Sequence, residues 1–372
     1  MKLKKYKLGE LIELCDERNS YGYTNFYGLN INKEFMPTWA NTEGLDESKY
    51  KVVRKRRFVF SGMQTGRDGC IRISMYNGEN PIIVSPAYTT FEVTREDLVL
   101  SEYFFMLFLS KEKDRLGAFC SDGSIRSNLD WERFCDFEIT LPSIEQQRKY
   151  VDVYLALQSN LASYQSKVEE LKLVCDGYLD KLKVENEKLK IGEFIEQYDK
   201  RNSDNRLKLN SVKGISTEKS FIDTNADMYG VGLTSYKVVE TTTFVYVPDT
   251  SRRGDKMAIA LNRGEEPVLV SSIYTTFKSK DTSMLLPEYL FMFFDRPEFD
   301  RYARFNSWGS AREVFTMDDM NEVKIPIPDI KVQQEIVNIH KCYIERQRIA
   351  EALKEQINNI CPVLIQGSLM EE

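Results

Sequence analysis

The stretch IIVSPAYTTFEV (residues 82–93) has a close counterpart, VLVSSIYTTFKS (residues 268–279), 186 positions further along the chain. Both stretches are rich in β-branched and aromatic residues, which favour β-strands. The tetrapeptide YTTF occurs in both at the same offset. One shared tetrapeptide is weak evidence, so the surrounding sequence decides whether the chain contains a repeat.

The surrounding sequence repeats in the same order. The pairs at this offset are YKVV (50–53) with YKVV (236–239), EYFFMLF (102–108) with EYLFMFF (288–294), and GSIR (123–126) with GSAR (309–312). The matches are collinear over about 140 residues per copy, far more than the repeating unit of a solenoid. The chain is therefore a duplication of a whole globular domain.

The two copies also begin and end alike. KLGELIELCDERNS (7–20) resembles KIGEFIEQYDKRNS (190–203) at an offset of 183. ITLPSIEQQ, which ends at residue 147, resembles IPIPDIKVQQ, which ends at residue 334, and predicts one inserted residue in the second copy. The expected segments are a first domain at 1–143, a helix at 144–186, a second domain at 187–330 and a helix at 331–372.

Each copy is followed by a long amphipathic segment in which apolar residues recur in alternating steps of four and three. This spacing predicts helices with a coiled-coil seam, the first about 38 residues or about 57 Å long. Pro362 is expected to kink or end the second helix. We expect the helices to pair with each other; the alternative is that each packs on its own domain. The predicted seam residues are Tyr154, Leu157, Leu161, Tyr164, Val168 and Leu171 in the first helix and Tyr343, Leu353, Ile357 and Ile360 in the second.

The globular parts are predicted to mix strands and helices. Residues 56–62, 70–76 and 81–93 have strand composition and are bounded by glycine, asparagine and proline. Residues 100–119 are expected to form one amphipathic helix, with Ser101 as its N-cap. WERFCDFEITLP (131–142) predicts a short helix and then a strand that stops at the proline. Each domain is therefore α+β.

Composition and charge limit the class of protein. With 372 residues, 42% hydrophobic and 29% charged, the chain can bury one core or two. It has no apolar run of roughly 18 residues and no signal peptide, so we expect a cytoplasmic protein. The seven cysteines include no C-x-x-C pair and are expected to be reduced. A net charge of −6 does not by itself favour nucleic-acid binding.

No catalytic or metal-binding residue is predicted. The single histidine, His340, follows a seam position and is expected to be solvated, and one histidine cannot supply a triad to each domain. SGMQTGRDG (61–69) matches neither nucleotide-binding glycine motif and is interpreted as a turn between strands. EVK (322–324) has nuclease-like spacing without an acidic partner upstream, and is interpreted as an edge strand. The chain is therefore expected to be non-catalytic.

Basic and polar clusters are the candidates for binding. KVVRKRRF (51–58) and DTSRRGDK (249–256) carry charges suited to phosphate contact, and GSIRSN and GSAREV each place an arginine after a glycine. The alternatives are a solvated charged face and contacts within the domain. The candidate DNA-binding residues are Arg54, Arg56, Arg57, Gln64, Thr65, Arg67, Arg126, Ser251, Arg252, Arg253, Lys256 and Arg312.

The layout of these segments resembles a known family. GSIRSNLDWERFCDFEITLPSIEQQRKYV (123–151) and GSAREVFTMDDMNEVKIPIPDIKVQQEIV (309–337) each lead through a strand ending in proline to a glutamine-containing helix start. The copies open on KLGE and KIGE. This layout, over essentially the whole chain, is similar to the specificity subunits of Type I restriction-modification systems.

The resemblance implies two target recognition domains that each read half of a split site in double-stranded DNA, joined by two helices in an antiparallel coiled coil with a pseudo-twofold axis. It implies two modification (methyltransferase) subunits that bind adenosylmethionine, restriction subunits that use ATP and Mg, and no cofactor in this chain. Because the copies have diverged, the site should be bipartite and asymmetric. Two alternatives stay open: a DNA-recognition partner of another methyltransferase or nuclease system, and an assembly scaffold that binds no nucleic acid.

Overall fold

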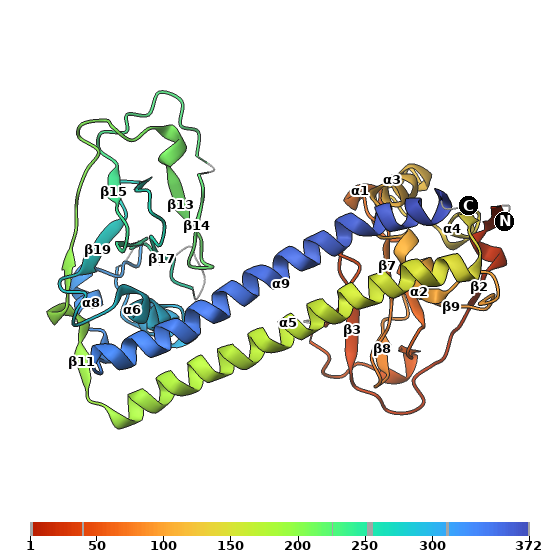
Figure 1. Cartoon of the computed structure of the whole chain (residues 1–372), viewed down its shortest axis with the longest axis horizontal. Helices are drawn as coiled ribbons and strands as arrows, with labels where there is room; N and C mark the ends of the chain where they lie inside the picture. Colours follow the sequence, from red (N-terminus) through yellow and green to blue (C-terminus); the bar gives the residue numbers. More distant parts are fainter. Residues whose placement is uncertain (1–2, 39–40, 225, 251–255, 310–311, 371–372) are drawn as a thin grey trace. The chain divides into compact units, whose positions relative to one another are not determined.

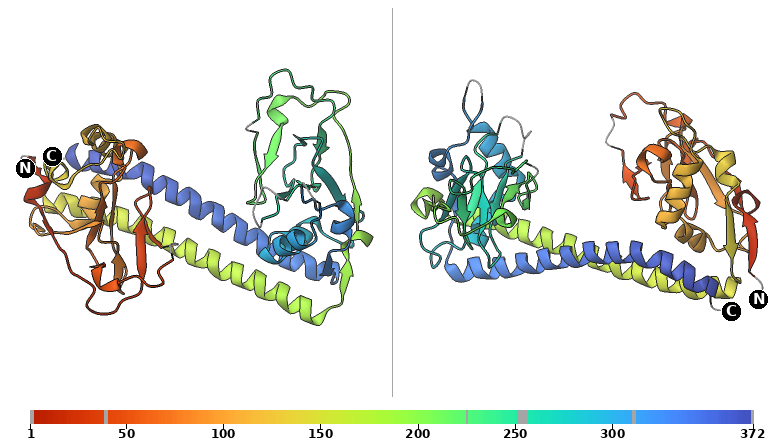
Figure 2. Two further views of the ribbon diagram at one scale, coloured as in Figure 1. Left: turned by 180° about the vertical axis from the view of Figure 1, so that it is seen from behind. Right: turned by 90° about the horizontal axis from the view of Figure 1, so that it is seen from above.

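The computed structural model describes residues 3–38, 41–224, 226–250, 256–309 and 312–370. The chain forms two compact units, Met1–Gln165 with Arg348–Glu372, and Ser166–Gln347. Each unit contains one globular module and half of each of two long helices. We call the globular parts module 1 (residues 3–143) and module 2 (residues 188–329). Both ends of the chain lie in the first unit (Figure 2).

Module 1 is built on a four-stranded antiparallel sheet. Its strands, in order across the sheet, are β2 (Ile12–Leu14), β9 (Thr89–Val93), β6 (Phe58–Ser61) and β7 (Arg72–Met75). A second sheet has the order β4 (Phe35–Pro37), β3 (Phe26–Leu29), β8 (Ile82–Val84) and β5 (Lys51–Val53), and β1 (Lys4–Lys7) pairs with β10 (Glu138–Leu141). The helices are α1 (Thr65–Asp68), α2 (Ser101–Leu107), α3 (Lys111–Cys120) and α4 (Trp131–Cys135).

Module 2 repeats this plan. Its main sheet has the order β12 (Ile195–Gln197), β19 (Thr275–Ser279), β16 (Phe244–Tyr246) and β17 (Ile259–Leu261). Three strand pairs accompany it: β11 (Lys188–Lys190) with β20 (Lys324–Pro326), β13 (Lys213–Ile215) with β14 (Phe221–Asp223), and β15 (Lys237–Val239) with β18 (Val268–Val270). The helices are α6 (Pro287–Phe294), α7 (Pro297–Phe305) and α8 (Met317–Asn321). The predicted duplication of an α+β domain is confirmed.

The YTTF segments lie in the same place in both modules, on the central strands β9 and β19. Phe91 stacks on Phe58 of β6 with ring centroids 5.0 Å apart, and Phe277 stacks on Phe244 of β16 at 4.7 Å. The preceding threonine in each copy is buried and donates its hydroxyl to a carbonyl just after the first strand of the main sheet. YTTF is therefore retained because it supports the core of each module.

The long helices are α5 (Ile144–Glu185, 42 residues) and α9 (Ile330–Met370, 41 residues). In the first unit, the first half of α5 packs on the last half of α9 and on module 1, and in the second unit the opposite halves pack on module 2 (Figure 1). Tyr103 of module 1 lies 2.7 Å, hydroxyl to hydroxyl, from Ser368 near the end of α9. Each helix thus packs antiparallel to the other, with one half on module 1 and the other half on module 2.

Most of the predicted seam is buried or partly buried. Tyr154, Leu161 and Ile357 are buried, and Leu157, Tyr164, Val168, Leu171, Tyr343 and Leu353 are partly buried. Ile360 is 38% exposed, and Cys361 occupies the fully buried place instead. The reason is that two steps of four occur in succession from Leu353, which a regular alternation of four and three does not allow. The helix also continues through Pro362 to Met370.

Three other expectations are corrected by the structure. The helix predicted at residues 100–119 is two helices, α2 and α3, and Ser110 caps the second by accepting a hydrogen bond from the Glu112 amide. Leu100, not Ser101, is the N-cap of the first. His340 is buried and not solvated, and burial, followed by the charge of Arg263, lowers its pKa to about 4.

A buried glutamine fixes the start of each long helix. Gln147 donates to the carbonyls of Leu98 and Pro142 at 2.8 and 3.0 Å and accepts from the Leu100 amide at 3.0 Å. Gln333 makes the same three bonds at an offset of 186, to Met284, Pro328 and Leu286. Gln147 is therefore equivalent to Gln333 and not to Gln334, so the predicted inserted residue is wrong.

Candidate nucleic-acid interface

Two polar loops lie against each other in module 1, and we call residues 62–69 with residues 121–128 the loop pair of module 1. The Leu129 amide donates to the Gly62 carbonyl at 2.9 Å, and the Gly66 amide donates to the Ser127 carbonyl at 3.0 Å. A Cβ on Gly66 would lie 2.0 Å from the Ser127 hydroxyl oxygen. Gly62 and Gly66 are therefore needed for close approach of the two loops.

Three predicted residues with side chains that reach solvent lie in the loop pair. Gln64 has a left-handed backbone (φ 62°), and its backbone N–H donates a hydrogen bond to the side-chain oxygen of Asn128 at 3.3 Å. Arg67, in α1, is exposed, and Arg126 in the facing loop is exposed as well. Thr65 is fully buried and donates to the Gly62 carbonyl, so its hydroxyl supports the turn and does not face solvent.

In the part of module 2 that the structure describes, residues 248–250 and 312–315 lie against each other, as their equivalents do in module 1. The Phe315 amide donates to the Pro248 carbonyl at 2.9 Å, which repeats the bond between Leu129 and Gly62. The Thr250 amide donates to the Glu313 carbonyl at 3.0 Å. The predicted residues Ser251, Arg252 and Arg253 lie outside the described residues. Lys256 is exposed and pairs with Glu218 at 2.7 Å, and Arg312 is exposed.

A buried ion pair anchors the strand that follows each loop. Lys33 lies 2.6 Å from an Asp114 carboxylate oxygen, which also accepts the Ile71 amide at 2.9 Å. In module 2, Lys219 pairs with Asp300 at 3.0 Å, and Asp300 accepts the amide of Met257 at 2.9 Å. Both lysines have left-handed backbones. The same scaffold therefore holds two loop pairs of different sequence.

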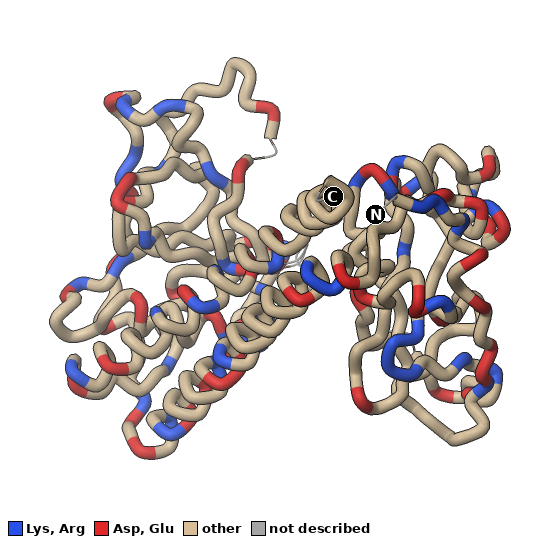
Figure 3. Tube along the Cα trace, turned by 45° about the vertical axis from the view of Figure 1, so that its right-hand side comes forward, with Lys and Arg blue, Asp and Glu red and all other residues tan. Residues whose placement is uncertain are grey.

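The basic run Arg54–Arg57 lies at the opposite end of β6 from residues 62–69, and acidic side chains neutralise it. Lys55 pairs with Glu79, and Arg56 pairs with Glu96 at 2.7 Å and with Glu102 at 3.4 Å. Figure 3 shows basic and acidic residues interspersed in both modules. The run therefore does not form an unpaired basic patch together with the loop pair.

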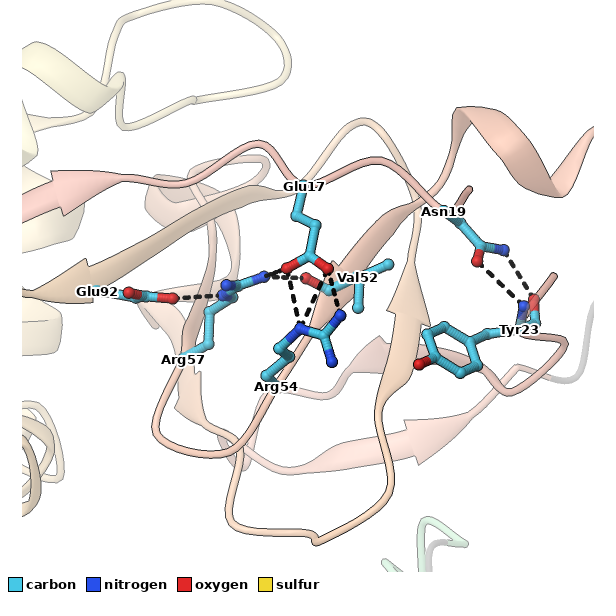
Figure 4. Close-up of polar contacts among 7 residues, drawn as sticks. All are labelled: Glu17, Asn19, Tyr23, Val52, Arg54, Arg57 and Glu92. Atoms are coloured by element: carbon cyan, nitrogen blue, oxygen red, sulfur yellow. Dashed lines mark hydrogen bonds and ion pairs between the residues drawn. The ribbon is translucent and has the colours of Figure 1, made fainter. Parts of the chain in front are cut away.

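Arg57 and Arg54 converge on one carboxylate (Figure 4). Arg57 is buried and contacts Glu17 and the Val52 carbonyl with one nitrogen, at 2.8 and 2.7 Å, and Glu92 with another at 2.7 Å. Hydrogen bonds from Arg54, and then from Arg57, hold the pKa of Glu17 below its usual range. Arg57 is thus engaged inside the module, and Arg54 is partly so. These contacts favour a supporting role inside the module for Arg57, whereas the partly exposed Arg54 stays a candidate for phosphate contact.

The charges of this pair are exchanged in module 2. Glu17 and Arg54 correspond to Lys200 and Glu240, which also form an ion pair. Because both charges are reversed, the two side chains still attract each other. This is expected if the pair stabilises the module and does not bind a ligand of fixed charge. The sequence alone could not reveal this because the partners are 37 to 40 residues apart.

Among the described residues, no group of three or more His, Cys, Asp or Glu side chains is arranged to hold a metal ion. In the same part of the chain, none of the helices has the length and hydropathy of a membrane span.

Comparison with known proteins identifies the repeat. A model of the Type I restriction modification DNA specificity domain matches residues 2–173 and again residues 183–359. The chain belongs to this family. Each match includes one module and much of the long helix that follows it. The repeated unit in the sequence is therefore a module and the long helix that follows it. The compact units of the structure are divided differently, because each contains one module and half of both long helices.

One solved structure supports the fold assignment. The crystal structure of the S subunit of a Type I restriction-modification system from M. genitalium matches with a TM-score of 0.59 over 99% of this chain and 96% of that one, at 12% identity. A structure from work on assembly and conformational transition of the type I system has 12% identity over 99% and 98% of the chains, at a TM-score of 0.45. The HsdS subunit from Thermoanaerobacter tengcongensis has 14% identity over 98% and 96%, at 0.34. No curated protein sequence matches this chain.

Proposed function

We propose that this chain is the DNA sequence-recognition subunit of a Type I restriction-modification complex and that each module reads one half of a bipartite site. The observation that carries the proposal is the loop pair, which the same scaffold holds in both modules. Gln64, Arg67 and Arg126 offer hydrogen-bond donors suited to phosphates and base edges. The chain itself is proposed to be non-catalytic.

The two half-sites are proposed to differ in sequence. Two scaffold contacts recur in both modules: one backbone hydrogen bond between the loops and the lysine–aspartate ion pair. The loops themselves differ, because Met63 and Gln64 of module 1 correspond to Asp249 and Thr250 of module 2. Arg126 and Arg312 are the shared element, and are therefore assigned to phosphate contact, which carries no sequence information. Different side chains on one scaffold imply an asymmetric recognition sequence.

The long helices are proposed to dock the methyltransferase subunits. Each helix buries one face, yet Leu173 and Val184 of α5 are 75% and 86% exposed, and Val363 of α9 is exposed as well. Exposed apolar side chains on a rigid helix are typical of a surface that binds protein. A helix of 42 residues is about 63 Å long, enough to contact more than one subunit. Adenosylmethionine, ATP and Mg are assigned to the partner subunits, and the complex is expected to act in the cytoplasm.

The proposal is tested by co-expressing the chain with its cognate methyltransferase subunit and mapping methylated adenines in the host genome. We expect one motif with two defined, unlike halves around an unspecified spacer. A chain truncated before residue 331 should lose both the assembly and the methylation. If the intact complex retains no duplex at low salt, the chain is a scaffold and the proposal fails.

A further inference from the structure

One exposed face is preserved in both modules although no packing contact requires it. Phe119 near the end of α3 is 87% exposed, and Phe305 at the end of α7 is 80% exposed. Within the described residues, they are the one pair of identical large apolar side chains that are exposed at equivalent positions of the two modules. A side chain that the core does not use, kept in both copies, indicates a contact outside the chain.

The two phenylalanines belong to a larger matching surface. On α3, Glu112, Arg115 and Phe119 follow at i, i+3 and i+7 and so share one helix face. All three are exposed, and Arg115 pairs with Glu112 at 2.9 Å. Glu298, Arg301 and Phe305 are the exposed equivalents on α7. We call these the outer faces of α3 and α7.

The chemistry of this surface fits protein better than DNA. The three residues that define each face are one acidic, one basic and one apolar side chain, which together have no net charge, whereas a surface that binds phosphates is strongly basic. A hollow of about 560 Å³, lined by Glu112, Lys113, Arg115, Leu116 and Phe119, gives the α3 face room for an inserted side chain.

In the second unit, the outer face continues onto the long helices. A cavity of about 380 Å³ is lined both by Glu298 and Arg301 of α7 and by Asp176 of α5 and Tyr343 of α9. The α7 face is therefore part of one surface with the helices to which we assign docking.

We infer that the outer faces of α3 and α7 each bind one copy of the same protein partner, the methyltransferase subunit. Surfaces that read different bases have to differ between the modules, whereas two surfaces that bind two identical partners have to be alike. The partner should present an apolar pocket for the phenylalanine, flanked by charges complementary to the glutamate and arginine. This inference rests on the proposed function, because it takes the partner from it.

The test uses the full-length chain co-expressed with the cognate methyltransferase subunit. The variants are Phe119→Ser, Phe305→Ser and the double substitution, with Ile273→Ser as a matched control. Ile273 is exposed as well, but its equivalent in module 1 is Ala87. Native mass spectrometry and titration give the stoichiometry and affinity. Each single variant should weaken one of the two partner sites about 30-fold, and the double variant both, as expected for loss of an interface hot spot.

Wild-type assembly by the double variant overturns the inference. If that variant assembles normally but the complex binds duplex DNA about 30-fold more weakly, the faces contact DNA, and the inference fails while the proposed function stands. If the wild-type chain binds no methyltransferase subunit at all, the proposed function fails together with the inference. The control variant should match the wild type in every measurement.

Discussion

Replacing Gln333 by leucine should destabilise the second unit by at least about 3 kcal/mol. The side chain is fully buried, and its loss leaves the carbonyls of Met284 and Pro328 and the amide of Leu286 without their partner. Each orphaned buried group costs about 1–3 kcal/mol. Leucine has a similar volume, so the expected loss comes from hydrogen bonding and not from a cavity.

The assay is unfolding in urea, measured by hydrogen exchange of individual peptides. The peptides report the unfolding midpoint of each unit separately. With a urea dependence of about 2 kcal/mol per molar, the midpoint of the second unit should fall by about 1.5 M, while the first unit changes little. Gln334→Leu is the matched control, because Gln334 is exposed and bonds only within the helix, to Asn338 at 2.9 Å among its described contacts. It should stay within about 0.5 kcal/mol of the wild type. Equal effects of the two substitutions would refute the assigned role of the buried glutamine.

Three further outcomes follow from individual side chains. Arg126→Ala should weaken duplex binding by the assembled complex for all sequences and reduce the salt slope by about one; an unchanged slope in a salt titration would exclude a phosphate contact. Ile357→Ala should cost about 2–4 kcal/mol in urea unfolding, but Ile360→Ala less than about 0.5, and equal costs would contradict the seam seen in the structure. Burial and the charge of Arg263 lower the pKa of His340 in the folded state to about 4, below the unfolded value of about 6.5. The contribution of neutral His340 to stability is therefore full above about pH 6.5 and is lost as the pH falls from about 6.5 toward 4. A His340→Gln variant should lack this loss between pH 7 and 5, and an identical pH dependence would show that other groups cause it.

The sequence was sufficient to predict those parts of the fold that depend on local pattern. The helix and strand at residues 131–141 follow from residue composition and from the proline that stops the strand. The single strand predicted at residues 81–93 is wrong in one respect, because it forms two strands, β8 and β9, in different sheets. The long helices follow from the apolar spacing. The duplication itself was visible because equivalent segments follow in the same order in both copies, most of them at an offset of 186.

The sequence could not predict features that depend on contacts between distant residues. In the sequence, Arg57 and Arg67 are both arginines of polar segments and could not be told apart. In the structure, Arg57 is buried and forms ion pairs with Glu17 and Glu92, whereas Arg67 is exposed. The seam changes phase at Cys361 because an α-helix has 3.6 residues per turn and not 3.5. The contact between the two polar loops of each module depends on tertiary structure as well, although both loops were found from their composition.

The central claim is that the two modules read DNA independently on one shared scaffold. The most direct test replaces residues 204–305 by the equivalent segment of a related specificity subunit and maps adenine methylation in the genome. We predict that one half of the recognised motif changes, while the other half and the spacer stay as they were. A change in both halves, or no change in either, would contradict the claim.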